Sequence, residues 1–433
     1  MTVKKLISWS LALFFTLTIN SSMAIAQSSV VVMSRNIYLG ADVGKALELI
    51  PDLPAAAQFM WDQMRKTDFA TRAELLADEI NQNQPDVIGV QEATIWRCQK
   101  NVWSKKTTVY DFIEILLGNL SGKYVVAEFN GVKAYNPGFS ISPIPYLTRV
   151  EDPKVFKELF SQNTASCGFE TGDLLLVKKQ LQNQIINLGN SEYEATYSIV
   201  PTIMTVYRGY SWADIKINGV PTRFITTHLE SLWDENKVPN SARQARQLIL
   251  DTKNTAMPLI VMGDFNSDPR DPRGSNSANP GEQPVESESC PIKSSICNAY
   301  KLMIESGFKD AGPNSLDPKN FSWGMNAYLT GADEARRVFA EKMGNEFGFT
   351  DRLDYIFYKN GVNFKESKIF GLKPKYPSDH AGVVANLEVS NTSNLVSPGL
   401  ESHKPFPISF WQWVAIVIIL LITWISWRKS IRK

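Results

Sequence analysis

The sequence LIVMGDFNSDP, residues 259–269, decides how the rest of the chain is interpreted. The run 258–262 is apolar, which predicts a strand buried on both faces. Gly263 then leads directly into two polar residues, Asp264 and Asn266. A buried strand that ends in a carboxylate and an amide predicts polar chemistry at the edge of a sheet. The same pattern, an apolar run followed by a polar side chain, recurs along the chain.

Other short apolar runs predict further strands of the same fold. They lie at residues 30–33, 87–90, 174–177, 215–217, 223–227, 353–358 and 383–389. Apolar residues at helical spacing predict helices at 68–82 and 241–251. Strands interspersed with helices indicate a mixed α and β fold. Three stretches, 96–170, 268–291 and 311–350, have the pattern of surface insertions.

The two ends have the composition of targeting segments. Residues 1–26 begin with a basic start, continue in an apolar run and end in Ala-Ile-Ala, which predicts a signal peptide. Residues 408–427 carry no charge and, at about 1.5 Å per helical residue, reach about 30 Å, which predicts a transmembrane helix. The flanking segments are a spacer, 391–407, and a basic tail, 428–433, expected to stay in the cytoplasm. We therefore expect an exported catalytic domain, 27–390, anchored to a membrane; buried helices at either end are the alternative.

The charge of the chain between these ends limits its partners. Without the basic residues of both ends, acidic residues slightly outnumber basic ones. Proteins that grip nucleic acid by its backbone alone are usually markedly basic. The balance therefore counts against a processive DNA-binding protein, but it does not exclude a nuclease.

The four cysteines allow three disulfide pairings. Cys290 and Cys297 are close in sequence, which favours a bond between them and leaves Cys98 to pair with Cys167. A zinc site is the alternative, but no Cys-x-x-Cys or neighbouring His supports it.

Polar side chains with catalytic potential lie at or beside the ends of most predicted strands. The set comprises Asn36, Glu92, His228, Asp264, Asn266, Asp354, Asp379 and His380. In a sandwich of strands and helices such positions converge on one rim, so a single site explains them together. Taken singly, a strand-end Asn is usually a turn former and a His is usually just hydrogen-bonded. Because two of only three histidines belong to the set, a shared function is favoured.

Three of these residues suit a magnesium ion. Glu92 and Asp379 offer hard carboxylate oxygens, which fit Mg²⁺ or Mn²⁺ better than zinc or copper. Asn36 can support the same ion through its amide oxygen. Mg²⁺ usually keeps several waters and binds substrate phosphate as well. The expected cofactor is therefore Mg²⁺ or Mn²⁺.

The other five residues suit hydrolysis of a phosphate ester. Asp264 could orient and deprotonate the attacking water, with Asn266 donating a hydrogen bond that fixes it. His228 and His380, if protonated, can neutralise phosphate oxygens as charge builds in the transition state. Asp354 is placed to hold the ring of His380.

Seven motifs extend this pattern over most of the chain. They are RNIYLG from Arg35, DVIGVQEA from Asp86, TTHLES from Thr226, VMGDFNSDP from Val261, FSW from Phe321, DRLDYIF from Asp351 and SDHAGV from Ser378. The chain resembles, over about 28–390, the endonuclease/exonuclease/phosphatase superfamily of deoxyribonuclease I, bacterial neutral sphingomyelinases and inositol polyphosphate 5-phosphatases. The resemblance implies a four-layer sandwich, with two mixed β-sheets packed face to face and helices outside, and one-step hydrolysis by a metal-activated water.

The resemblance also implies roles for single residues. It makes Asn36 and Glu92 the metal-site pair, with Asp379 a further acid on the metal side. By the same comparison His228 and His380 resemble the phosphate-binding histidines, Asp264 and Asn266 the water-orienting pair, and Asp354 the partner of His380. The abasic-site endonuclease branch commonly has an acid at the position of Tyr38 and a Tyr at that of His228. The chain therefore lies nearer the nuclease, sphingomyelinase and phosphatase branches.

The substrate stays open between several classes. A nuclease would need basic residues around the pocket, such as Arg208, Arg243 and Arg246. A sphingomyelinase-like phospholipase C would show exposed aromatic residues on a hairpin beside the site. Trp212, Trp233 and Trp323 could stack bases or enter lipid, but core positions are equally suitable. A phosphatase of inositol-phosphate type and a non-catalytic binding module on the same fold are the alternatives.

Overall fold

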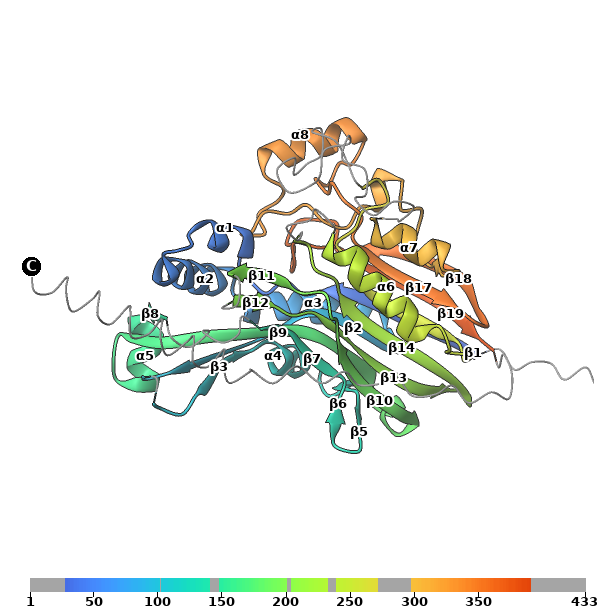
Figure 1. Cartoon of the computed structure of the whole chain (residues 1–433), viewed down its shortest axis with the longest axis horizontal. Helices are drawn as coiled ribbons and strands as arrows, with labels where there is room; N and C mark the ends of the chain where they lie inside the picture. Colours follow the sequence, from blue (N-terminus) through green and yellow to red (C-terminus); the bar gives the residue numbers. More distant parts are fainter. Residues whose placement is uncertain are drawn as a thin grey trace, which may run out of the picture.

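Two β-sheets packed face to face form the centre of the computed structural model (Figure 1). The structure describes residues 28–101, 103–140, 148–200, 204–232, 239–271 and 297–390. Within these residues the first sheet has nine strands: β1 (Ser28–Asn36), β2 (Val87–Gln99), β3 (Thr107–Asp111), β4 (Tyr124–Val126), β7 (Tyr135–Ser140), β8 (Arg149–Glu151), β9 (Thr164–Lys178), β18 (Val362–Phe370) and β19 (Gly382–Val389). The second has six: β10 (Ile185–Glu192), β13 (Gly209–Ile217), β14 (Val220–His228), β15 (Leu259–Asp264), β16 (Lys309–Asp310) and β17 (Asp354–Lys359). Two small hairpins pair β5 (Glu128–Phe129) with β6 (Val132–Lys133) and β11 (Tyr197–Val200) with β12 (Met204–Val206).

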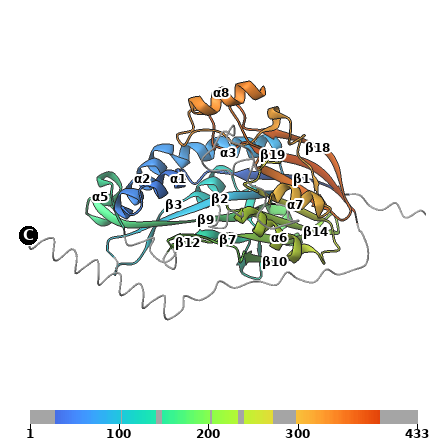
Figure 2. The same ribbon diagram turned by 45° about the horizontal axis from the view of Figure 1, so that its top comes forward.

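Helices cover both outer faces of the paired sheets (Figures 1 and 2). The α-helices are α1 (Val43–Glu48), α2 (Leu53–Thr67), α3 (Phe69–Asn83), α4 (Phe112–Asn119), α5 (Pro153–Phe160), α6 (Asn240–Thr252), α7 (Ala299–Glu305) and α8 (Glu334–Met343), and the 3₁₀ helices are η1 (Lys179–Gln184) and η2 (Pro318–Asn320). The apolar faces of α2, α3 and α4 pack on the first sheet, and those of α6 and α7 pack on the second. The result is the mixed α and β sandwich with helices outside that the sequence predicted.

The layer between the sheets is apolar and tightly packed. Val32 and Val87 of the first sheet meet Ile260, Met262 and Ile356 of the second, and all five are fully buried. The sheets approach so closely at Gly89 that an added Cβ would lie 2.8 Å from the Cβ of Met262. A larger residue at this position would force the sheets apart close to the strand ends that carry the candidate residues.

The strand pairings bring the predicted side chains to one edge. β1 is parallel to β2, and β14 is parallel to β15, so the carboxyl ends of these strands point the same way within each pair. His228 is in register with Asp264 across the β14–β15 pair, and Asp264 is in register with Asp354 across the antiparallel β15–β17 pair. Backbone pairing alone therefore places three of the candidate residues side by side.

Both helices predicted from apolar spacing are confirmed. The helix expected at 68–82 is α3, and the helix expected at 241–251 is α6. Buried residues in α3 recur at helical spacing, as in Phe69, Ala73, Leu76 and Ile80, which is why this segment folds as a helix against the sheet.

The prediction that 96–170 is a surface insertion was wrong. Much of this segment continues the first sheet, because β2 and β9 pair antiparallel from Val87 to Gln99. Cys98 and Cys167 lie in register on these strands and form a disulfide, which confirms that pairing. Cys290, the predicted partner of Cys297, and most of the predicted insertion 268–291 lie outside the described residues. The stretch 311–350 carries η2 and α8 above the sheets (Figure 1).

The predicted localisation needs correction. Among the helices that the structure describes, none has the length and apolar character needed to cross a membrane. The predicted signal peptide, 1–26, and transmembrane helix, 408–427, lie outside the described residues. The exported, membrane-anchored localisation is therefore withdrawn, and the domain limits 27–390 stay a prediction.

Candidate active site

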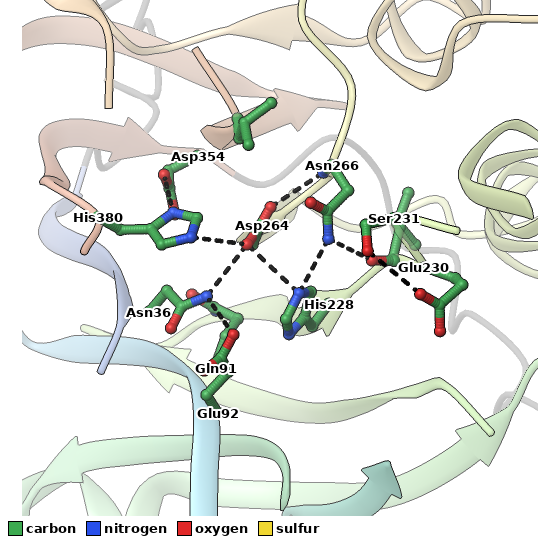
Figure 3. A network of polar contacts seen from close by, with 12 residues as sticks. Asn36, Gln91, Glu92, His228, Glu230, Ser231, Asp264, Asn266, Asp354 and His380 are labelled. Atoms are coloured by element: carbon green, nitrogen blue, oxygen red, sulfur yellow. Dashed lines mark hydrogen bonds and ion pairs between the residues drawn. The ribbon is translucent and has the colours of Figure 1, made fainter. Parts of the chain in front are cut away.

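Asp264 is the centre of the polar network at the sheet edge (Figure 3). Its Oδ2 atom accepts a hydrogen bond from Nδ2 of Asn36 at 3.1 Å and lies 3.3 Å from Nε2 of His228 and 3.5 Å from Nε2 of His380. Its Oδ1 atom accepts from the backbone N–H of Asn266 at 2.9 Å. Burial raises the pKa of Asp264 to about 7, although His380 opposes the increase. The carboxyl group can therefore exchange a proton near neutral pH.

His380 lies between two buried carboxylates. Its Nδ1 atom is 2.9 Å from Oδ2 of Asp354, and its Nε2 atom faces Asp264. Burial disfavours the charged ring, but Asp354, then Asp264 and Asp379, raise the pKa of His380 to about 10. His380 is therefore an imidazolium at neutral pH.

His228 has the opposite electrostatic environment. Its Nδ1 atom lies 3.1 Å from a guanidinium nitrogen of Arg208, and its Nε2 atom lies 3.0 Å from Nδ2 of Asn266. Burial first, then the positive charges of Arg208 and His380, lower the pKa of His228 well below its ordinary value. The two histidines that the sequence paired therefore differ in charge, with His228 neutral and His380 positive.

Asn36 and Glu92 belong to the first sheet and lie beside Asp264, which ends a strand of the second sheet. Nδ2 of Asn36 donates to Oε1 of Glu92 at 3.1 Å, and Oε2 of Glu92 accepts from the backbone N–H of Leu39 at 2.5 Å. Asp379 is half-buried, and burial raises its pKa to about 6, with Glu92 adding to the increase and His380 opposing it. These oxygen donors, two of them mutually repelling carboxylates, fit a hard divalent cation, which would stabilise both in the charged form.

A second group of possible ligands overlaps the network. Within the described part of the chain, ligand atoms of Asp264, Asp354 and His380 all lie within 4.8 Å of one another. Nδ1 of His380 is hydrogen-bonded to Asp354, so within this group only its Nε2 atom, which faces Asp264, is open toward a cation. In the described structure the three residues form an acid–imidazole–acid chain.

Three residues at the site have strained backbone conformations. Tyr38, Glu92 and Asn266 have φ angles of 59°, 60° and 44°, in the left-handed region that residues other than glycine rarely adopt. Glu92 lies where the β2–β9 register shifts between Val90 and Ala93, so a bulge redirects its side chain out of the strand's regular alternation. Such positions cluster at functional sites.

Several residues that support the site were not predicted from the sequence. Arg72 of α3 is buried and donates to the carbonyl oxygens of Ile37, Tyr38 and Pro377, which fixes the loop that follows Asn36 and the loop that carries Asp379. An arginine on the apolar face of the predicted helix 68–82 was the available signal. Other supporting residues are Arg35, Gln91, Asp173, Glu230 and Ser378.

The sequence around this site matches a known protein family. The family model described as "Endonuclease/Exonuclease/phosphatase family" matches residues 36–380. The chain belongs to this family. The matched range begins at Asn36 and ends at His380, so it includes all eight predicted site residues. No curated protein matches the sequence.

Solved structures of three proteins are similar to this chain. An endonuclease/exonuclease/phosphatase family protein from Bacteroides thetaiotaomicron has 14% identity and a TM-score of 0.44, covering 84% of this chain and 100% of its own. A family protein from Leptotrichia buccalis has 16% identity and a TM-score of 0.44, covering 83% and 99%. A mannosyl-6-phosphatase from Bacteroides thetaiotaomicron has 14% identity and a TM-score of 0.42, covering 83% and 99%.

The structure brings the predicted residues together. Asn36, Glu92, His228, Asp264, Asn266, Asp354 and His380 form one connected network (Figure 3). Asp379 joins it through its electrostatic interactions with Glu92 and His380. Of the tryptophans considered from sequence, Trp212 is buried in the core, Trp323 is half-buried beside His380, and Trp233 lies outside the described residues.

Proposed function

We propose that this chain is a divalent-metal-dependent hydrolase of phosphodiesters. One geometric observation carries the proposal: Oδ2 of the buried Asp264 lies 3.3 Å from Nε2 of His228 and 3.5 Å from Nε2 of His380, and burial raises the pKa of this carboxyl to about 7. A base, a neutral hydrogen-bond donor and a cation within one network can together promote hydrolysis of a phosphate ester. A non-catalytic binding module would not need this arrangement.

Each group has a role that follows from its environment. Asp264 accepts a proton from the attacking water as the new phosphorus–oxygen bond forms, and the backbone of Asn266 keeps Oδ1 of the carboxylate in place. His380 places a positive Nε2–H against the phosphoryl oxygens, where negative charge develops. His228 contributes a neutral donor on the other side. The ester bond then breaks, its electron pair stays with the leaving oxygen, which takes a proton from solvent water to become the alcohol, and Asp264 returns its proton to solvent.

The proposed metal ligands are Asn36, Glu92 and Asp379. A bound Mg²⁺ or Mn²⁺ would supply positive charge that polarises the phosphate. The chain's own contribution is to hold Glu92 in an oriented position, through Asn36 and the backbone of Leu39.

The turn between β2 and β3 favours a phospholipid head group as substrate. Trp103 at this turn is 93% exposed, and Lys100, Lys105 and Lys106 around it are exposed too. An indole flanked by lysines suits the head-group region of a lipid surface. Glu92 and Gln99 are seven positions apart on β2, so at about 3.3 Å per residue the turn begins roughly 23 Å from the site. One lipid surface can span that distance.

Arg208, one of the three basic residues proposed for a nuclease, is not available to bind a nucleic acid. Arg208 donates to Glu230 and faces His228, so its guanidinium is occupied inside the protein. We therefore favour a sphingomyelinase-like phospholipase C over a nuclease or an inositol-phosphate phosphatase.

The test is a parallel substrate screen of the full-length protein with Mg²⁺. DNA, RNA, sphingomyelin vesicles and phosphoinositides are incubated, and released products are measured. We expect release of phosphocholine from sphingomyelin, and we expect Trp103→Ala to slow this reaction without slowing hydrolysis of soluble bis(p-nitrophenyl) phosphate. Cleavage of DNA or RNA alone would favour the nuclease, and phosphate release from phosphoinositides the phosphatase. No turnover of any substrate by folded protein would contradict the proposal.

A further inference from the structure

The Nδ1 atom of His228 faces an arginine. A guanidinium nitrogen of Arg208 lies 3.1 Å away, and Nε of the same side chain donates to Oε2 of Glu230 at 3.2 Å. Arg208 is 9% exposed and Glu230 is 2% exposed, so this ion pair is buried. A guanidinium can donate hydrogen bonds but cannot accept them. Nδ1 of His228 must therefore be the acceptor, without a proton.

The other ring nitrogen has two neighbours of opposite kinds. Nε2 lies 3.0 Å from Nδ2 of Asn266, which is a donor, and 3.3 Å from Oδ2 of Asp264, which is an acceptor. The amide of Asn266 is oriented by a second contact, because its Nδ2 also donates to the carbonyl oxygen of Leu229 at 2.7 Å. Asn266 by itself would favour a proton on Nδ1, and Arg208 favours a proton on Nε2. The two donors compete for the one acceptor nitrogen of a neutral imidazole.

We propose that Arg208, held by Glu230, is a positioning residue that selects the Nε2–H tautomer of His228. This inference rests on the proposed function, in which Nε2 is the atom that donates to the phosphoryl group. In this tautomer the proton on Nε2 faces Oδ2 of Asp264, which lies 3.3 Å away, and it would turn to a phosphate oxygen when substrate binds. Without Arg208, Nε2 would instead accept from Asn266 and would have no proton to donate.

The local environment explains why the residue is an arginine. Its planar group contacts a carboxylate through Nε and an imidazole through a terminal nitrogen, a geometry that a lysine ammonium cannot reproduce. Burial alone would lower the pKa of Arg208, but Glu230 and then the buried Asp173 raise it. The guanidinium therefore stays charged and remains a permanent donor. Its contacts to Glu230 and His228 commit it to orienting the ring instead of binding phosphate.

The tautomer can be measured without any substrate. The sequence contains three histidines, so long-range ¹H–¹⁵N spectra of the full chain with ¹⁵N-labelled histidine are simple to assign, with His228→Ala identifying the signal. We expect wild type to show His228 protonated on Nε2 only. In Arg208→Met we expect the signal to change to the Nδ1–H tautomer or to a mixture of both.

A matched control separates this effect from lost stability. Arg223 is also buried and forms an ion pair with Asp214, but it lies near the opposite end of β14. Arg223→Met should leave the His228 tautomer unchanged, whatever it does to the thermal midpoint. If Arg208→Met does not fold, Arg208→Lys and Glu230→Ala break the two-point contact in other ways and should give the same change of tautomer.

Kinetics then distinguish positioning from phosphate binding. With bis(p-nitrophenyl) phosphate, Arg208→Met should lower kcat by about a hundredfold and leave KM and inhibition by inorganic phosphate nearly unchanged. A raised KM with weaker phosphate inhibition would show that Arg208 binds phosphate and would overturn the inference. An unchanged tautomer in all Arg208 and Glu230 variants would overturn it as well. Absence of turnover in wild type, with the expected tautomers present, would defeat only the proposed function.

Discussion

Replacing Asp354 by Asn should move the alkaline limit of activity to lower pH. The Oδ2 atom of Asp354 is 2.9 Å from Nδ1 of His380, and the residue is fully buried. An Asn of the same size keeps the packing and can still accept the Nδ1–H bond through its oxygen. It removes the negative charge that contributes most to the raised pKa of His380.

The size of the effect follows from the pKa of His380. Its ordinary value is 6.5 and its value in the folded protein is about 10. At about 1.4 kcal/mol per pKa unit, the difference corresponds to roughly 5 kcal/mol in favour of the imidazolium. Asp354 is the largest of the three contributing carboxylates, so its loss should lower the pKa of His380 from about 10 toward its ordinary value. The charged ring exists below its pKa, so activity is lost as pH rises through that value.

The assay is kcat/KM for bis(p-nitrophenyl) phosphate between about pH 6 and 10.5 with saturating Mn²⁺ or Mg²⁺. We expect an alkaline limb near 10 for wild type and at clearly lower pH for Asp354→Asn, with the rate at pH 7 falling much less than at pH 9. Asp251→Asn is the control, because Asp251 lies on α6, away from the network, and accepts a hydrogen bond from the hydroxyl of Tyr210 on β13. Superimposable alkaline limbs for wild type and Asp354→Asn would refute the assignment of a charged His380.

Three further predictions concern the same network. His228→Ala and His380→Ala should each lower kcat about a hundred- to thousandfold, which corresponds to a barrier higher by about 2.7–4 kcal/mol. Replacing rings that only fill the core would instead lower the thermal midpoint and preserve activity per folded molecule. Chelation by EDTA should abolish turnover, Mg²⁺ or Mn²⁺ should restore it, and recovery with Zn²⁺ alone would contradict the oxygen ligand set of Asn36, Glu92 and Asp379. The acid limb of the pH–rate profile should lie near pH 7, because Asp264 acts as a base only when deprotonated and its pKa is about 7. In His380→Gln this limb should move to higher pH, since the nearby positive charge that lowers the pKa of Asp264 is gone. An acid limb near pH 4 in wild type would exclude Asp264 as the base.

The strands that carry the site could be predicted because they are buried on both faces. β15 reads as a continuous apolar run ending in Asp264, and β17 reads as a run beginning at Asp354. Once such strands are placed in one sheet, their polar ends must lie close together, so the grouping of His228, Asp264 and Asp354 was accessible from sequence. The helix α3 was predictable for a similar reason, since its buried residues follow one helical period.

Edge strands and long-range contacts could not be predicted in the same way. β10 and β18 lie at the ends of their sheets, and the exposed polar residues that protect such edges also weaken the alternation that identifies a strand. The continuation of β2 toward Cys98 was missed because its partner β9 is distant in sequence. The charge difference between the histidines was not predicted, because Arg208 contacts His228 from the short loop that precedes β13, the strand next to β14.

The most direct test of the account is the turnover number of Asp264→Asn, measured with its thermal midpoint at pH 8. Burial raises the pKa of Asp264 from 3.8 to about 7, so the charged carboxylate reduces the stability of the folded state progressively as pH rises through this range, and a neutral Asn of the same shape removes that cost. The account predicts that kcat on bis(p-nitrophenyl) phosphate falls at least a thousandfold while the thermal midpoint does not fall. Preserved turnover in a folded Asp264→Asn protein would show that the centre of this network is not the catalytic base.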